Sequence, residues 1–140
     1  MSDGLRLDGV LETALYVDDL ARARGFYADV LRLDVLYEDS RMCAFSVGGR
    51  SVLLLFPRGG SLKTVVMPGG TIPPHDGSGP LHIALSVSAE QLPAWETHLA
   101  ANGIAIEGRT TWKRGGQSIY FRDPDGHLLE LATPGLWAIY

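Results

Sequence analysis

The chain has 140 residues, enough for one domain with a substantial hydrophobic core. Apolar residues make up 46%, charged residues 20%, and the net charge is −4, values that are typical of a soluble globular protein and argue against a nucleic-acid-binding surface. No apolar run is long enough for a membrane helix, and the N-terminal "MSDGLRLDG" has no signal-peptide layout. The single cysteine, Cys43, cannot form an internal disulfide, which predicts a cytoplasmic protein. Neither nucleic acid nor a membrane is therefore an expected partner.

The start of the chain predicts one strand, one helix and three more strands. Residues 10–17, "VLETALYV", alternate as a strand that places Glu12 and Tyr16 on one face. The next segment, "DDLARARGFYADVL", has the aspartate cap and the apolar stripe of a helix. Three strands joined by polar or glycine turns follow in "LDVLYED", "RMCAFSVGG" and "RSVLLLFP".

Residues 58–80 interrupt this pattern. The stretch "RGGSLKTVVMPGGTIPPHDGSGP" is dense in glycine and proline and is too long for a simple turn in a compact domain. It is either a linker or a functional loop that closes as a lid. His75 lies within it and is a candidate general base, because histidine titrates near neutrality. The alternative is a histidine in an ordinary turn.

The second half repeats the order of the first. "LHIALSV" predicts a strand with His82 and Ser86 on one face. "SAEQLPAWETHLAANG" predicts a helix in which Ser88 and Gln91 form a capping box and Gly103 marks the end. Three strands are predicted after it, in "IAIEGR", "QSIYFRD" and "HLLELAT".

The repeat predicts one α+β domain, residues 1–140, built from two βαβββ modules. The modules span residues 8–57 and 81–134, and residues 58–80 link them. Each module is too small to hold a good core alone, so the sheets are expected to pair, within one chain or between the two copies of a homodimer. The apolar C-terminal tail, residues 135–140, is expected to dock on a sheet edge or on a dimer partner.

Laying one half on the other brings out a set of possible metal ligands. Glu12 falls on His82, and Leu54 falls on Glu130. A carboxylate on an apolar strand, such as Glu130, is costly unless it is paired or bound to a cation. A cation held by Glu12, His82 and Glu130 would remove that cost and leave coordination positions open. Taken singly, Glu12 also fits a solvated edge residue, His82 a hydrogen-bonded core histidine, and Glu130 an ion pair with Arg122.

Further residues are candidates for the pocket around such a site. Tyr16, Ser86 and Tyr120, together with Leu54, are expected to contact the substrate or to wall the pocket. Arg58 and Lys113 are candidates for binding a substrate anion on charge alone.

The segment "DPDG", residues 123–126, has the composition of a type I turn. Such a turn fixes the register that aims Glu130 inward, and it leaves His127 facing away from the site.

Two motifs resemble those of the vicinal oxygen chelate superfamily, which includes glyoxalase I, bleomycin resistance proteins, fosfomycin-modifying thiol transferases and extradiol dioxygenases. "DLARARGFYADVL" is similar to D-L-x-x-(A/S)-x-x-F-Y-x-x-x-L, and "YFRDPDGHLLEL" to F-x-D-P-(D/E)-G-x-x-(I/L)-E-(L/F). The resemblance implies two βαβββ modules whose curved mixed sheets form an open cleft. It also implies that metal ligands project into this cleft, with His82 and Glu130 at ligand positions.

Two positions depart from the superfamily pattern. Glu12 stands where a histidine is common, and Leu54 stands where glyoxalase I commonly has a carboxylate, which disfavours a glyoxalase site with four protein ligands. One histidine and two carboxylates form a harder ligand set than the two histidines and one glutamate of the dioxygenases and thiol transferases. The set predicts one divalent cation per site, Mn²⁺, Fe²⁺, Zn²⁺, Ni²⁺ or Mg²⁺.

The resemblance and the residues together predict a metal-dependent enzyme of lyase or isomerase, transferase or dioxygenase type, acting on a small molecule. The metal is expected to chelate vicinal oxygens of the substrate and to stabilise an enolate or oxyanion, and Glu12 or Glu130 is a candidate base. The alternative is a metal-free module that sequesters a small aromatic or drug-like ligand, as bleomycin resistance proteins do. The fold alone does not choose between these functions.

Overall fold

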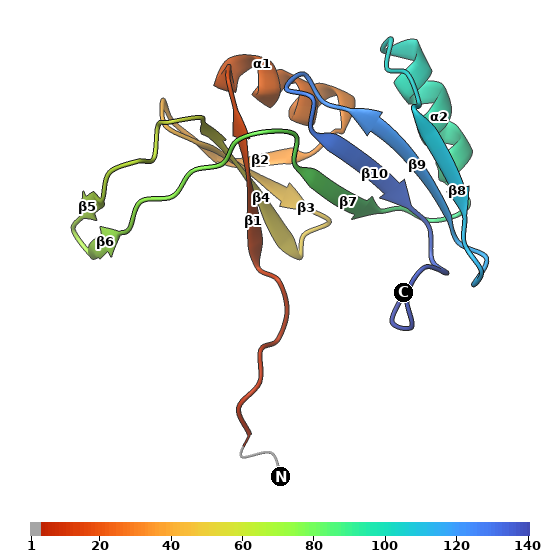
Figure 1. Ribbon diagram of the computed structural model, residues 1–140, viewed down its shortest axis with the longest axis horizontal. Helices are drawn as coiled ribbons and strands as arrows, with labels where there is room; N and C mark the ends of the chain where they lie inside the picture. Colours follow the sequence, from red (N-terminus) through yellow and green to blue (C-terminus); the bar gives the residue numbers. More distant parts are fainter. Residues whose placement is uncertain (1–3) are drawn as a thin grey trace.

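The computed structural model describes residues 4–140 and contains two modules of like composition (Figure 1). The first module consists of β1 (Glu12–Val17), α1 (Leu20–Gly25), the π-helical turn η1 (Phe26–Val30), β2 (Asp34–Glu38), β3 (Cys43–Val47) and β4 (Ser51–Pro57). The second consists of β7 (His82–Ser86), α2 (Leu92–Ala101), β8 (Gly108–Thr111), β9 (Gln117–Arg122) and β10 (Leu128–Ala132). The segment between them forms a hairpin, β5 (Val65–Met67) and β6 (Gly70–Ile72), that projects from the first module.

Both modules have the same strand order. The sheets run β1-β4-β3-β2 and β7-β10-β9-β8. In each module the first strand is parallel to the last, and the other neighbours are antiparallel. This topology confirms the expected α+β fold of two βαβββ modules with mixed sheets. Figure 1 shows α1 and α2 on one side of the sheets and both chain ends on the other. No helix within residues 4–140 has the length and apolar character needed to cross a membrane.

One hydrophobic core serves both modules and lies on the helix side of the sheets. It joins buried side chains of β1, β3, β4 and α1 to those of α2, β9 and β10. Leu15 and Val17 of β1 point into this core, while Tyr16 between them is only half-buried, as the predicted alternation requires. The opposite side of each sheet, which we call the open face, therefore carries Glu12 and Tyr16.

Polar contacts through residues 123–127 join the two modules inside this core. The Tyr27 hydroxyl donates to Asp123 Oδ2 at 2.7 Å, and the His127 backbone N–H donates to Asp123 Oδ1 at 2.9 Å. The buried His127 ring accepts from the Leu81 N–H at Nδ1, 2.9 Å, so its Nε2–H donates to the Tyr16 carbonyl, 2.7 Å away. The turn therefore connects the modules in addition to reversing the chain.

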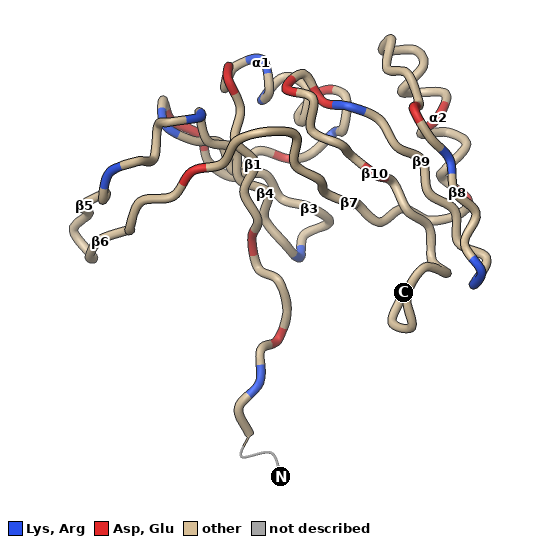
Figure 2. The backbone as a smooth tube through the Cα atoms, viewed as in Figure 1, with Lys and Arg blue, Asp and Glu red and all other residues tan. Residues whose placement is uncertain are grey.

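A charged cluster completes this junction. The Asp125 carboxylate accepts from the Asp18 backbone N–H at 2.8 Å and lies 3.3 Å from Arg22 and 3.7 Å from Arg58. Arg58 also pairs with the Asp18 carboxylate at 2.8 Å. Figure 2 shows this mixture of acidic and basic residues near α1. Arg58, a candidate for binding a substrate anion, is thus paired with carboxylates of the junction. Lys113, the other candidate, lies exposed in the turn before β9.

Two local predictions differ from the structure. The strand predicted in "IAIEGR" begins only at Gly108, because Ile104 and Ile106 pack against the core from irregular backbone. The second helix begins at Leu92, and the Ser88 hydroxyl accepts from the Gln91 N–H within the preceding turn, so the predicted capping box lies one turn too early. In the tail, the Tyr140 hydroxyl docks on the Ala132 carbonyl at 2.8 Å.

We predict that Tyr27→Phe destabilises the protein by roughly 1–3 kcal/mol, because it leaves Oδ2 of the buried Asp123 carboxylate without its donor. Burial and the adjacent Asp123 raise the pKa of Tyr27 far above its ordinary value, so the hydroxyl is the donor at every working pH. Urea denaturation measures the change. The matched control is Tyr37→Phe, whose hydroxyl donates to Asp39 on the surface and is expected to matter by less than about 0.5 kcal/mol. Equal effects of the two substitutions would contradict the proposed importance of the junction.

Candidate functional site

His82 and Glu130 lie together on the open face of the second module. β7 and β10 are parallel neighbours, with Leu128 opposite His82 and Ala84 opposite Glu130. The register brings His82 Nε2 to 3.3 Å from Glu130 Oε1. The glutamate is only 6% exposed, whereas the histidine side chain is 50% exposed. The pair therefore consists of a buried carboxylate beneath an imidazole that solvent can reach.

The hydrogen bonds of His82 determine which of its nitrogens can bind a cation. Nδ1 lies 2.9 Å from the Leu128 carbonyl oxygen, which can only accept, so Nδ1 carries the proton. In the neutral ring the Nε2 lone pair then points to the Glu130 carboxylate. Two lone pairs at this distance need a proton or a cation between them. Metal-ligating histidines commonly donate their other ring N–H to a backbone carbonyl, as Nδ1 of His82 does here.

The second carboxylate oxygen of Glu130 is bound by a serine. The Ser118 hydroxyl donates to Oε2 at 2.5 Å and accepts from the Trp112 indole N–H at 2.9 Å. Arg122, the alternative partner expected from the sequence, pairs with Glu107 at 3.1 Å instead. Glu130 therefore has no cationic partner other than His82 among residues 4–140.

Glu12 does not complete a three-residue group with this pair. Within the described part of the chain, no three His, Cys, Asp or Glu side chains are close enough to hold a metal ion. Glu12 is exposed at the start of β1, and no described residue pairs with its carboxylate. It lines a gap between the β1–β4 edge and β7, together with His82 and Ser86. A single chain thus assembles two of the three predicted ligands.

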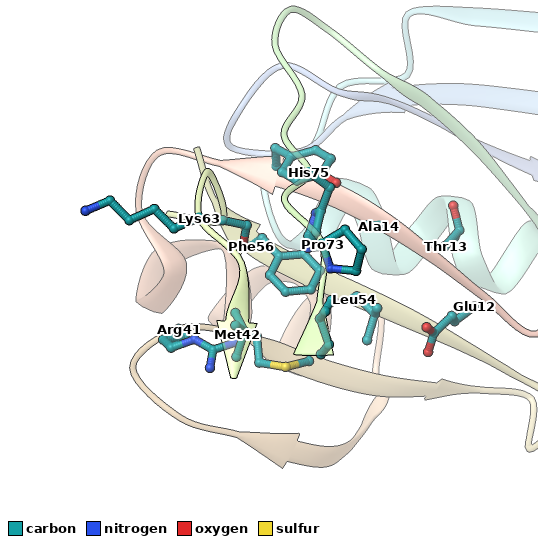
Figure 3. Close-up of a pocket in the computed structure, with 14 residues that line it drawn as sticks. Glu12, Thr13, Ala14, Arg41, Met42, Leu54, Phe56, Lys63, Pro73 and His75 are labelled. Carbon is teal, nitrogen blue, oxygen red and sulfur yellow. The ribbon is translucent and has the colours of Figure 1, made fainter. Parts of the chain in front are cut away.

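The first module carries a pocket of about 450 Å³ on its open face (Figure 3). Its lining is mostly apolar, and Figure 3 shows Glu12 at one end, Lys63 at the other and Phe56 and His75 between them. The predicted pocket residues Tyr16 and Leu54 both line it. The segment 58–80, predicted to be a linker or a lid, forms one side of this pocket through Ser61, Lys63, Val65, Ile72, Pro73 and His75.

A tyrosine–histidine contact holds that segment in place. The Tyr16 hydroxyl lies 2.7 Å from His75 Nδ1, and the His75 ring packs edge-on against Phe56 with centroids 4.6 Å apart. Burial and the nearby Asp76 raise the pKa of Tyr16, so the phenol stays protonated at neutral pH. Gly77 lies directly against the Tyr16 ring, where a Cβ would overlap it. Contacts with Tyr16 and Phe56 therefore hold His75 in the lining of the pocket.

The remaining pocket candidates belong to the second module. Tyr120 lies opposite Glu130 on β9, and its ring centroid is 6.5 Å from that of His82. Ser86 is exposed in the gap between the modules. The sequence analysis missed Ser118 and Trp112. Ser118 shares the open face with Tyr120, two residues away, and was therefore detectable by alternation; Trp112 had no such signal.

We predict that Gly77→Ala destabilises the covering segment, because the added methyl group must displace the Tyr16 ring. Overpacking of this kind costs about 1–3 kcal/mol, and limited proteolysis within residues 58–80 should accelerate. Gly69→Ala is the matched control, since a Cβ there meets nothing within 4 Å. Unchanged proteolysis in Gly77→Ala would mean that Gly77 does not hold the segment on Tyr16.

Comparison with known sequences supports the family resemblance of the two sequence motifs. The Glyoxalase/Bleomycin resistance protein/Dioxygenase superfamily matches residues 9–131. Metallothiol transferase FosB from Staphylococcus saprophyticus is 31% identical over 122 residues, covering 84% of this chain and 71% of the relative. FosB from Bacillus licheniformis is 32% identical and covers 89% of this chain and 75% of its own length.

Solved structures give the same result. A lactoylglutathione lyase from Agrobacterium tumefaciens is 32% identical, with a TM-score of 0.85 and coverage of 94% of this chain and 98% of that one. The fosfomycin resistance protein FosX from Listeria monocytogenes, at 22% identity and a TM-score of 0.68, covers 90% and 91% and shares the fold. The protein therefore belongs to the glyoxalase/bleomycin resistance/dioxygenase superfamily, as its two motifs predicted.

Proposed function

We propose that the protein is a metal-dependent transferase that joins a thiol to a small oxygen-bearing substrate. The observation that carries the proposal is the pair of His82 Nε2 and the buried Glu130 Oε1, 3.3 Å apart, with the other ring nitrogen of His82 held by the Leu128 carbonyl. The support for a transferase is the 31–32% identity to metallothiol transferases over most of the chain. The name of the similar lactoylglutathione lyase also points to a thiol.

His82, Glu130 and Glu12 are the residues proposed to hold the metal. The imidazole is already in the tautomer that leaves Nε2 free, and the buried carboxylate has no other cationic partner within the described residues. One nitrogen and two carboxylates suit hard or borderline ions, namely Mn²⁺, Fe²⁺, Zn²⁺, Ni²⁺ or Mg²⁺. The bound ion would act as a Lewis acid on adjacent oxygens of the substrate.

We propose that the third ligand is Glu12 of a second copy of the chain. Glu12 is exposed and joins no metal-binding group within residues 4–140. Large apolar side chains that precede it in the chain are also exposed: Leu7 at 96%, Val10 at 79% and Leu11 at 69%. Apolar surface of this kind favours association with another subunit. A homodimer would bring the Glu12 end of one pocket to the His82–Glu130 pair of the other copy.

The pocket on the first module would hold the body of the substrate, with Tyr16, Leu54 and Phe56 as its walls. In thiol transfer the S–C bond forms as a C–O bond breaks, and the thiol proton must reach the released oxygen. His75 is proposed to carry this proton at Nε2, which has no partner among the described residues. The Tyr16 contact fixes the orientation of the ring.

A second candidate function is metal-free binding of an aromatic ligand. The observation in its favour is the largely apolar pocket walled by the rings of Tyr16, Phe56 and His75. In that case His82 and Glu130 would share a proton as an ion pair. Metal content separates the two functions.

We predict one divalent cation per chain in protein purified without chelators or nickel resin. His82→Ala and Glu130→Ala should lose it, because each removes a ligand, whereas the exposed Glu90→Ala should keep it. Elemental analysis of the dialysed proteins measures the content. If the wild type holds no metal and takes up none of the five candidate ions, the transferase proposal fails and ligand binding in the pocket becomes the leading function.

A second prediction concerns the shared site. Glu12→Ala and Glu130→Ala chains should each lack complete sites, but their heterodimer contains one intact site, so a statistical mixture should regain roughly a quarter of the wild-type metal. Co-expression with two different affinity tags provides the mixture. A heterodimer without metal would show that the ligands meet within one chain.

A further inference from the structure

A hydrogen-bonded chain behind Glu130 is not explained by the metal ligands themselves. Ser118 is only 1% exposed, yet its hydroxyl lies 2.5 Å from Glu130 Oε2 and 2.9 Å from the Trp112 indole nitrogen. We propose that Trp112 and Ser118 are positioning residues that hold Glu130 as a ligand through one oxygen only. The inference rests on the proposed metal site and states how that site is tuned.

The direction of this chain is fixed at both ends. The indole N–H can only donate, and an ionised carboxylate can only accept. Ser118 must therefore accept from Trp112 and donate to Glu130, which leaves its hydroxyl proton a single orientation. Successive hydrogen bonds of this kind polarise and strengthen one another in a buried setting.

The consequence concerns the number of coordination positions that Glu130 occupies. Ser118 occupies Oε2, while Oε1 faces His82 Nε2 at 3.3 Å. Ser118 already holds one lone pair of Oε2, so a cation bound through both oxygens would compete with this buried hydrogen bond, which is unfavourable. Glu130 would therefore offer a bound cation one oxygen, Oε1, and would leave a further coordination position for the substrate.

The internal repeat supports this reading independently. In the first module Leu54 pairs with Ala44 in the register in which Glu130 pairs with Tyr120. The position two residues before Ala44, which is equivalent to Ser118, is occupied by Met42. The module without a carboxylate thus also lacks the hydroxyl, so the two features occur together in the second module and are both absent from the first.

Trp112 is placed for this role by the end of the second sheet. Its backbone N–H donates to the Gly116 carbonyl at 2.8 Å, and the Gly116 N–H donates to the Gly135 carbonyl at 3.1 Å. An added Cβ at Gly116 would overlap the Gly135 backbone, so the close approach requires glycine there. Trp112 is 38% exposed. It therefore contacts solvent as well as the buried hydroxyl of Ser118.

The test compares Ser118→Ala, Ser118→Thr and Trp112→Phe with the wild type, using Mn²⁺ alone as the probe. Electron paramagnetic resonance of free Mn²⁺ gives the affinity. Removing the hydroxyl should weaken Mn²⁺ binding about 10–100-fold, Trp112→Phe should weaken it less, and Ser118→Thr should restore much of it. Ser46→Ala is the matched control, because that hydroxyl accepts only from Gly49 in the first module and should leave the affinity unchanged.

A second readout does not depend on bound metal. In ¹⁵N-labelled apoprotein the Trp112 indole N–H resonance, assigned with Trp112→Phe, should shift and exchange faster in Ser118→Ala. If Ser118→Ala does not fold by circular dichroism, the Trp112→Phe affinity and the Ser118→Thr rescue carry the test. If a folded Ser118→Ala variant binds Mn²⁺ with wild-type affinity, the proposed positioning role of Ser118 and Trp112 is wrong, but the proposed metal site is not affected. A wild type that binds no Mn²⁺, Fe²⁺, Zn²⁺, Ni²⁺ or Mg²⁺ overturns both.

Discussion

The insertion of the Asp-Pro-Asp-Gly turn into the first module is the constraint on which the rest of the arrangement depends. Asp123 is buried against the Tyr27 hydroxyl, and Asp125 accepts from the Asp18 backbone and faces two arginines. Buried carboxylates are tolerated only where such donors compensate their lost hydration. The two modules can therefore dock only in the orientation that supplies these donors, and the shared apolar core fills in around the contact.

This contact also sets the geometry of the proposed metal ligands. His127 hydrogen-bonds to Tyr16 and Leu81 from the core side, which fixes the phase of β10 as the strand begins. Because side chains alternate along a strand, Glu130 must then lie on the open face. A slip of one residue would turn that carboxylate into the apolar core and separate it from His82. The same turn thus determines the positions of a structural histidine, His127, and of the proposed metal ligand Glu130.

The two modules have the same topology but different chemistry. The first module has Leu54 and Met42 at the positions where the second has Glu130 and Ser118, and it carries a pocket with apolar and aromatic walls. The second module has the His82–Glu130 pair and, among residues 81–140, no loop as long as residues 58–80. A reaction that needs both a bound cation and a substrate pocket would therefore use the His82–Glu130 pair of a second module and the pocket of a first module. In the proposed homodimer, these two surfaces come from different copies of the chain.

The sequence by itself determined the repeat, the order of strands and helices in both modules, and the faces on which Glu12, His82 and Glu130 lie, because these follow from local periodicity and turn chemistry. It also identified Tyr16 and Leu54 as pocket residues. Only the tertiary structure decided that Glu12 lies apart from the other two proposed ligands, that Arg58 belongs to the junction, and that Trp112 and Ser118 are hydrogen-bonded behind Glu130. These features depend on contacts between segments far apart in the chain or across a turn. No periodicity within a single strand or helix encodes such contacts.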